Sequence, residues 1–231
     1  MCFCYVRSVS ERDVERLTQH LPLVYLPGAS GDSRVWQRIA ERLATRRRPY
    51  LVDYPDFRDS TATAHLRSYA DLVEAIAARL PETFDLVALS AGAAVALRLA
   101  LQHPTRVRAL VLVTVAAGVD ARRYGGTDYR PAFQRRRPEA PAWFVEGGPD
   151  LSDALAGVLA PTLLVFGSAD LIAPVALGRF LEQALPHARL EVIAGATHDL
   201  EEEHPDLLAS LIEAHLREHS DRPAASARVR R

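Results

Sequence analysis

The nine residues Phe84-Asp-Leu-Val-Ala-Leu-Ser-Ala-Gly92 predict a buried strand that passes directly into a helix. The mostly apolar run that ends at Leu89 is typical of a strand inside a sheet, and an alanine- and leucine-rich helix is expected from Ala91 to Gln102. Ser90 falls on the sharp turn between them. A serine on such a turn projects its hydroxyl above the edge of the sheet. Taken alone, this pattern fits a catalytic serine and a helix N-cap equally well.

Short apolar runs alternate with amphipathic segments on both sides of this stretch. The expected strands are 21–26, 49–53, 107–115, 161–166 and 189–193, and the expected helices are 33–44, 64–80, 174–185 and 205–217. Apolar strands that alternate with helices predict an α/β fold, with a mostly parallel, doubly wound sheet covered on both faces. Right-handed crossovers bring the carboxyl ends of these strands to one edge, so the functional residues are expected there.

Composition excludes several functional classes. The formal net charge of the 231 residues is -1, which gives no indication of nucleic acid or a membrane surface as a partner. The chain contains arginine but no lysine, which excludes a Schiff base and a Walker-type phosphate loop. Its only cysteines, Cys2 and Cys4, are too few and too close for a disulfide framework, and no histidine pair stands beside them at zinc-finger spacing.

The chain divides into three expected parts. Residues 1–20 form an N-terminal arm, 21–218 a single domain with an insertion at about 119–160, and 219–231 a disordered tail. The insertion interrupts the alternation with four prolines and two Gly-Gly pairs, which is typical of a lid or binding loop. Without a secretory signal or an apolar run of about 20 residues, the expected location is the cytoplasm.

A glycine-rich turn follows the first strand. The run Leu26-Pro-Gly-Ala-Ser-Gly31 would let the backbone N–H of Ala29 face the serine, and the N–H of Ala91 would complete an oxyanion hole with it. An ordinary strand-to-helix loop also favours glycine and serine, but the position of this turn, directly after the first strand, favours the functional interpretation.

Two more turns at the same edge carry ionisable side chains. Asp170 follows the strand that ends at Phe166, and His198 follows the strand that ends at Ile193. Singly, an acid before a helix fits the helix dipole, and a histidine in a loop is more often simply solvated. Together with Ser90 they occur in the order Ser, Asp, His, each after a successive strand, which is the order of a nucleophile, an orienting acid and a base.

From about Leu21 to Arg217 the chain resembles the α/β-hydrolase family, in its serine hydrolase and esterase branch. The resemblance rests on the runs 26–31, 87–92, 167–174 and 195–198, with Glu203 and Pro205 downstream. Pro27 stands where the family usually has histidine, and Ala88 where it usually has glycine. The turn 53–60 has lost its glycines, and because the N-terminal arm is short, we expect one or both leading strands of the family's sheet to be missing.

The resemblance implies hydrolysis of a small carboxylic ester or thioester through an acyl-enzyme on Ser90, with His198 as the base and Asp170 orienting it. It implies no metal and no organic cofactor, and the expected partner is a small ester-like molecule. Two alternatives remain open: a lyase or C–C hydrolase that uses the same triad, and an inactive binding protein that keeps the fold.

The insertion is rich in aromatic residues, which suggests an apolar roof over the substrate. Candidates for substrate binding are Tyr129, Phe133, Trp143 and Phe144. Its six arginines, at positions 122, 123, 130 and 135–137, could meet an anionic substrate. We favour a solvated face because acids in the same segment nearly cancel their charge.

Overall fold

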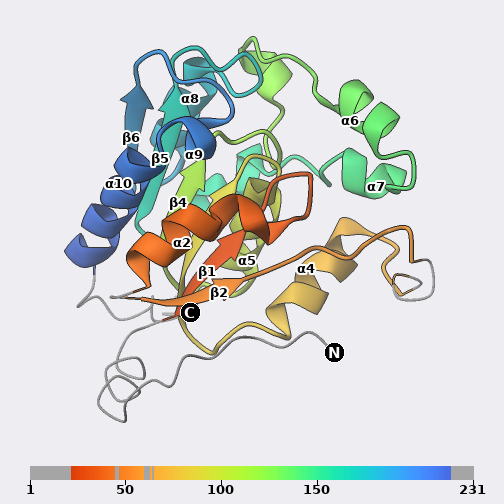
Figure 1. Ribbon diagram of the computed structural model, residues 1–231, viewed down its shortest axis with the longest axis horizontal. Coiled ribbons are helices and arrows are strands. Elements are labelled where there is room, and N and C mark those ends of the chain that lie inside the picture. The colour runs from red at the N-terminus through yellow and green to blue at the C-terminus, as the bar shows by residue number, and fades with distance from the viewer. Residues whose placement is uncertain (1–21, 45–46, 60–62, 64, 220–231) are drawn as a thin grey trace.

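A parallel sheet runs through the middle of the molecule, with helices on both faces (Figure 1). The computed structural model describes residues 22–44, 47–59, 63 and 65–219. In that part of the chain the sheet has six strands in the order β2-β1-β3-β4-β5-β6, and every neighbouring pair is parallel. The predicted doubly wound α/β sheet is therefore confirmed.

The elements follow one another largely as the sequence predicts. The strands are β1 (Pro22–Leu26), β2 (Arg48–Leu51), β3 (Phe84–Leu89), β4 (Val107–Val113), β5 (Thr162–Gly167) and β6 (Ala188–Ile193). The α-helices are α2 (Gln37–Leu43), α4 (Tyr69–Ala77), α5 (Gly92–Gln102), α6 (Arg130–Arg136), α7 (Ala142–Val145), α8 (Val175–Ala184), α9 (Leu200–Glu203) and α10 (Pro205–Glu218). Three short 3-10 helices are η1 (Ser33–Trp36), η2 (Ala121–Tyr124) and η3 (Ser152–Gly157).

Alternating side chains of each strand divide the core between the two faces of the sheet. Leu23 and Tyr25 of β1 belong to the cluster that η1, α2 and α10 cover. Val24 and Leu26 belong to the larger cluster that α4, α5 and α8 cover. Strand β3 is buried along its whole length, which explains its nearly continuous apolar sequence.

Local chemistry moves two of the expected boundaries. The helix expected over 64–80 begins only at Tyr69, because the hydroxyl of Ser68 accepts a hydrogen bond from the backbone N–H of Asp71 and caps it there. The strand expected to reach residue 115 ends at Val113, because Thr114 has a φ of 46°. The predicted arm at 1–20, with both cysteines, and the tail beyond residue 219 lie outside the described residues.

A buried carboxylate joins the amino ends of the strands to the last helix. The side chain of Asp85 on β3 is fully buried and accepts hydrogen bonds from Arg47 at 2.9 Å and from Arg108 at 3.4 Å. The same two guanidinium groups donate to the backbone carbonyls of Leu216 and His219 at the end of α10. Burial raises the pKa of Asp85, and the two arginines oppose that shift. This cluster lies at the edge of the sheet opposite the carboxyl ends of the strands.

His215 makes the stability of the fold depend on pH. Its ring is buried on α10, its Nε2 lies 3.2 Å from the carbonyl oxygen of Pro161, and burial lowers its pKa to about 4. The unfolded chain, with an ordinary pKa of about 6.5, binds more protons between these values, so the free energy of unfolding falls as the pH drops from 6.5 to 4. The full loss is about 3 kcal/mol.

Urea unfolding of the wild type and of His215→Gln at pH 7 and pH 5 checks this expectation. The variant should lose less stability over that interval, because it has no imidazole to protonate. Equal losses in the two proteins would show that His215 does not cause the pH dependence.

Within the described residues, no helix has both the length and the hydropathy needed to cross a bilayer.

Candidate active site

Ser90 occupies a strained turn at the carboxyl end of β3. Its φ of 51° lies in the left-handed region that residues other than glycine rarely adopt. Backbone hydrogen bonds hold the turn: Ser90 N–H donates to the carbonyl of Val113, and the carbonyl of Ser90 accepts from the N–H groups of Ala93 and Ala116. A Cβ at Gly92 would lie 2.3 Å from the carbonyl oxygen of Pro27, so only glycine lets α5 begin this close to the turn after β1. Strain of this kind is typical of functional sites.

Ser90, His198 and Asp170 form one hydrogen-bonded chain. The distance from Ser90 Oγ to His198 Nε2 is 2.8 Å, and the distance from His198 Nδ1 to Asp170 Oδ2 is also 2.8 Å. Because a carboxylate only accepts, the proton lies on Nδ1, which leaves Nε2 to accept the hydrogen bond of the serine hydroxyl. This is the arrangement in which an imidazole removes the proton of a nucleophile.

The acid turn is rigid. The side chain of Asp170 is fully buried, and its second oxygen, Oδ1, accepts hydrogen bonds from the backbone N–H groups of Ile172 and Ala173. A Cβ at Gly167 would lie 2.3 Å from the carbonyl oxygen of Ala196, so the acid turn and the histidine loop pack directly against each other. Both carboxylate oxygens of Asp170 therefore have hydrogen-bond partners: Oδ1 is held by the backbone, and Oδ2 accepts from the imidazole and orients it.

The histidine loop is fixed from its other side by Glu203. The carboxylate of Glu203 accepts hydrogen bonds from the backbone N–H of Thr197 at 2.8 Å and from its hydroxyl at 2.7 Å. Thr197 immediately precedes His198. Glu203 therefore fixes the backbone directly before His198. The resemblance to the family already pointed to Glu203, as a residue downstream of the run 195–198.

The turn after β1 lies against the serine. A Cβ at Gly28 would lie 3.4 Å from the Cβ of Ser90. Within the described part of the chain, the backbone N–H groups of Ala29 and Ala91 donate no hydrogen bond. Two unused donors beside a nucleophile can stabilise an oxyanion. The assignment of these two residues to an oxyanion hole stays a prediction.

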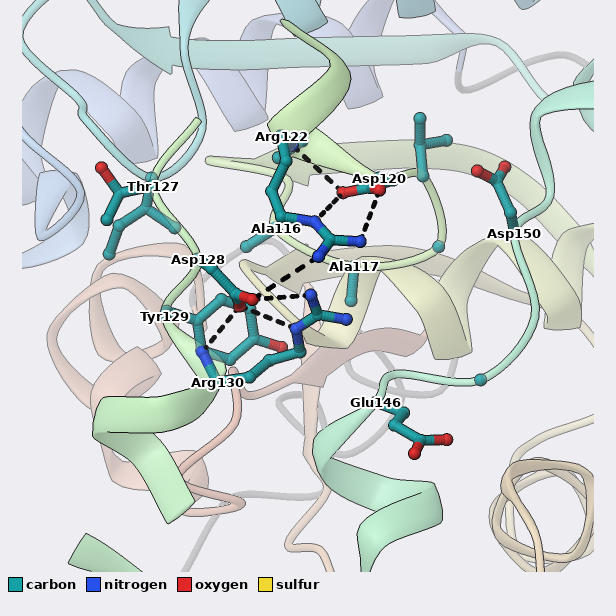
Figure 2. Close-up of a pocket in the computed structure, with 15 residues that line it drawn as sticks. Ala116, Ala117, Asp120, Arg122, Thr127, Asp128, Tyr129, Arg130, Glu146 and Asp150 are labelled. Carbon is teal, nitrogen blue, oxygen red and sulfur yellow. Dashed lines mark hydrogen bonds and ion pairs between the residues drawn. The ribbon is translucent and has the colours of Figure 1, made fainter. Parts of the chain in front are cut away.

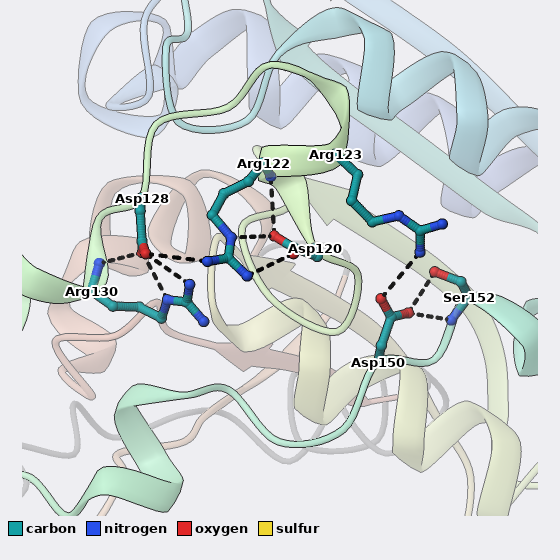
Figure 3. Close-up of polar contacts among 7 residues, drawn as sticks. All are labelled: Asp120, Arg122, Arg123, Asp128, Arg130, Asp150 and Ser152. Carbon is teal, nitrogen blue, oxygen red and sulfur yellow. Dashed lines mark hydrogen bonds and ion pairs between the residues drawn. The ribbon is translucent and has the colours of Figure 1, made fainter.

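The segment 119–160 connects β4 to β5 through η2, α6, α7 and η3, without a strand among its described residues. Figure 1 shows α6 and α7, in green, standing to one side of the sheet. The two ends of the segment meet at its base. The N–H of Leu151 donates to the carbonyl of Gly118 at 2.8 Å, and Arg123 lies 3.7 Å from the carboxylate of Asp150 (Figure 3).

The four aromatic residues predicted to bind substrate occupy different places. Phe144 packs against Tyr69, with Trp143 edge-on to the same ring. Phe133 and Phe144 line a very small pocket of about 10 Å³ together with Ala29. Tyr129 lines a separate and larger cavity. Their role in substrate binding stays a prediction.

That larger cavity, of about 220 Å³, is lined by residues that Figure 2 shows, and two of its lining residues hydrogen-bond to the triad. Ala116, whose N–H binds the Ser90 carbonyl, and Ile172, whose N–H binds Asp170, both line it. Its charged residues are largely paired with one another. Arg122 contacts Asp120 and Asp128, and Arg130 also contacts Asp128 (Figures 2 and 3). The predicted solvated face thus contains a set of local ion pairs, and three of them join residues only two positions apart: Asp120 and Arg122, Asp128 and Arg130, and Arg137 and Glu139.

Sequence reasoning missed Glu201, a buried carboxyl next to the histidine loop. Glu201 is 7 % exposed, and its Oε2 has no hydrogen-bond partner in the described structure. Burial raises its pKa to about 7, a shift that Asp199 and Glu202 increase and His198 opposes. The sequence has three consecutive glutamates at 201–203 and does not distinguish the buried one from its neighbours. Only the packing of α9 shows that it is Glu201.

Glu201→Gln should be more stable than the wild type at high pH. The folded protein holds the proton of Glu201 up to about pH 7, whereas the unfolded chain releases it near 4.5, so the wild type loses stability as the pH rises through this window. The amide has no proton to lose. We expect an advantage of up to about 3 kcal/mol at pH 8 that is absent at pH 4.5, measured by urea unfolding. The same offset at both pH values would exclude this titration.

Comparisons with known proteins agree with the geometry. Residues 23–153 match the model of the alpha/beta hydrolase family. The chain is 29% identical over 248 residues to a pimeloyl-[acyl-carrier protein] methyl ester esterase of Aeromonas hydrophila, covering 87% of this chain and 97% of that protein. It is 32% identical over 222 residues to the protein of the same name from Nitrosomonas europaea, covering 76% and 88%.

A solved structure shares the fold at low sequence identity. An alpha/beta hydrolase enzyme from a Medee basin deep-sea metagenome library superposes with a TM-score of 0.68 and is 17% identical, over 86% of this chain and 90% of that one.

Proposed function

The chain belongs to the alpha/beta hydrolase family and is a serine hydrolase of small esters, and we propose that it forms its acyl-enzyme on Ser90. The observation that carries this assignment is the continuous relay of two 2.8 Å hydrogen bonds from Ser90 Oγ through His198 to Asp170. The strained backbone of Ser90 supports the same conclusion, since it directs the hydroxyl away from the strand.

The reaction proceeds in two halves. His198 Nε2 takes the proton of Ser90 as Oγ attacks the ester carbonyl, and Asp170 stabilises the imidazolium that forms. The N–H groups of Ala29 and Ala91 bind the oxyanion of the tetrahedral intermediate. His198 then returns its proton to the leaving alkoxide. Water attacks the acyl-enzyme by the same proton path in reverse and releases the acid.

We infer further that the substrate is a methyl ester, or the ester of an equally small alcohol. The two curated relatives described above are named as methyl ester esterases. The pocket of about 10 Å³ beside Ala29 has room for a group about the size of a water molecule, which supports a methoxy leaving group. The acyl chain would occupy the cavity of about 220 Å³, beneath segment 119–160, for which we propose the role of a lid.

Methyl hexanoate and butyl hexanoate test this assignment, with acid release followed by pH-stat. The two esters give the same acyl-enzyme and differ only in the alcohol. We expect kcat/KM to be at least about tenfold higher for the methyl ester, because butoxide does not fit the small pocket. Equal values for the two esters would contradict the methyl ester assignment but not the serine mechanism. The cytoplasmic location stays a prediction from the sequence.

A further inference from the structure

We propose that Arg98 is a positioning residue that sets the acyl-chain preference of the esterase, by fixing one wall of the cavity of about 220 Å³ that Ala116 and Ile172 line. Arg98 lies on α5, the helix that begins directly after the nucleophile turn. Its guanidinium reaches Pro149, in the stretch of segment 119–160 between α7 and η3, and donates a hydrogen bond to it. The inference rests on the proposed function, because the cavity in question is the one assigned to the acyl chain.

The guanidinium of Arg98 makes three contacts. Nη1 donates to the carbonyl of Ala94, one turn earlier on α5, at 2.9 Å. Nη2 donates to the carbonyl of Pro149 at 2.8 Å. The guanidinium carbon lies 4.9 Å from the ring centroid of Tyr69 on α4, in a cation–π arrangement. The side chain of Arg98 therefore connects α5 and α4 to Pro149 in segment 119–160.

Burial makes this arrangement costly. Arg98 is only 7 % exposed, and within the described residues no carboxylate lies within ion-pair distance of it. Burial lowers the pKa of Arg98 accordingly. A buried charge without a countercharge destabilises a fold relative to an apolar side chain of similar size. Two carbonyls and one aromatic ring offset only part of that cost, so a functional role accounts for Arg98 better than stability does.

The chain around Pro149 is built to fit this side chain. Gly147 and Gly148 have φ values of 76° and 73°, which L side chains rarely adopt. A Cβ at Gly148 would lie 2.7 Å from Arg98 Nη2 and 3.0 Å from the ring of Tyr69. The backbone at Gly148 therefore lies directly on the stacked Arg98–Tyr69 pair.

The residues that Arg98 holds form part of the cavity wall. Gly148 and Asp150, on either side of Pro149, both line the cavity of about 220 Å³, and so does Glu146. Figure 2 shows Glu146 and Asp150 on this stretch of chain at the edge of the cavity, opposite Tyr129. Without the hydrogen bond from Arg98 to Pro149, this wall is free to move, whereas the hydrogen bonds that hold Asp170 and the histidine loop remain.

Tyr69 extends the contact to the aromatic residues. Its ring is stacked on Phe144 at a centroid distance of 6.4 Å, and its hydroxyl lies 3.4 Å from the carbonyl of Ala91. The nucleophile turn, Arg98 and the aromatic side of segment 119–160 thus share one packed unit. A change at Arg98 should alter the shape of the acyl site without touching the reacting atoms.

The test compares Arg98→Met with the wild type on methyl acetate and methyl hexanoate. Methionine keeps the length and the apolar stem but donates no hydrogen bond. We expect KM for methyl hexanoate to rise about tenfold while kcat stays within about twofold, and both constants for methyl acetate to stay within about twofold, because acetate does not reach the wall. Arg98→Lys, which keeps the charge and a donor group but not the planar fork of the guanidinium, should bring the hexanoate KM part of the way back to the wild-type value.

Arg106→Met is the matched control. Arg106 also lies over an aromatic ring, that of Phe84, at 5.7 Å, and donates to the backbone carbonyls of Ala77, Leu80 and Pro81. It lies at the amino ends of the strands, away from the triad. Its loss should lower the melting temperature but leave the hexanoate-to-acetate ratio of kcat/KM unchanged.

Gly148→Ala tests the same wall without removing the arginine. The added methyl group displaces the backbone from Arg98 and Tyr69, and we expect the same selective rise in KM for methyl hexanoate. The proposal is overturned if both Arg98→Met and Gly148→Ala leave the hexanoate-to-acetate ratio at the wild-type value, or if Arg106→Met changes it equally. A wild type that hydrolyses neither ester would instead overturn the proposed function.

Discussion

Ser90→Ala should lower kcat/KM for methyl hexanoate by about 10⁴-fold or more, to the residual rate that a site without its nucleophile supports. The same variant should no longer react with a fluorophosphonate, whereas the wild type is labelled at residue 90. Neither loss should come from unfolding, because alanine and serine meet similar strain at a φ of 51°. Urea unfolding and pH-stat turnover on the same preparations separate the two effects.

Ser210→Ala provides the control for this experiment. Ser210 lies on α10, where its hydroxyl donates to the carbonyl of Asp206 on the protein surface. It should keep wild-type turnover and labelling. If Ser90→Ala retains wild-type turnover, Ser90 is not the nucleophile, and labelling without ester turnover in the wild type would favour another reaction of the same triad.

Asp85→Ala should destabilise the fold by about 3–5 kcal/mol, the usual cost of removing one partner from a buried ion pair. The change removes the buried carboxylate that faces the guanidinium groups of Arg47 and Arg108, whose side chains are only 15% and 9% exposed. It also loosens the end of α10, since both arginines donate to backbone carbonyls there. A loss of this size is about a fifth or more of the stability of an ordinary domain.

Asp206→Ala is the surface counterpart. Asp206 pairs with Arg42 across α10 and α2, with both side chains largely exposed, so its removal should cost about 0.5 kcal/mol or less. Turnover per folded molecule should be unchanged in both variants, because Asp85 lies at the opposite edge of the sheet from Ser90. Equal destabilisation by the two substitutions would contradict the special role of the buried cluster.

The sequence predicts those parts of the fold that depend on local pattern. The mostly apolar run from Phe84 to Leu89 predicts a strand, because a strand that is buried on both faces needs apolar side chains on both. The structure has β3 over the same residues. The convergence of residues 90, 170 and 198 is also predictable, because parallel strands bring their carboxyl ends to one edge. The structure brings these three side chains together, as that topology requires.

Contacts between helices are not predictable in the same way. Arg98 and Tyr69 lie on two helices, and nothing in their spacing distinguishes them from solvated residues. The packing of α4 against α5 buries the guanidinium, and the turn at Gly148 brings it a second acceptor, the carbonyl of Pro149, in addition to that of Ala94. Glu201 is hidden for the same reason, since its burial depends on where α9 packs and not on its neighbours in the chain.

The local ion pairs of segment 119–160 have a consequence for the way substrate reaches the site. The segment contains six arginines and six acidic residues, and Arg122, Arg123, Arg130 and Arg137 each lie within 4 Å of an acid in the same segment. A surface whose charges cancel over such short distances has little long-range field. Diffusional capture of the ester should therefore be nearly independent of ionic strength, and the enzyme should recognise its substrate by shape after collision rather than attract it beforehand.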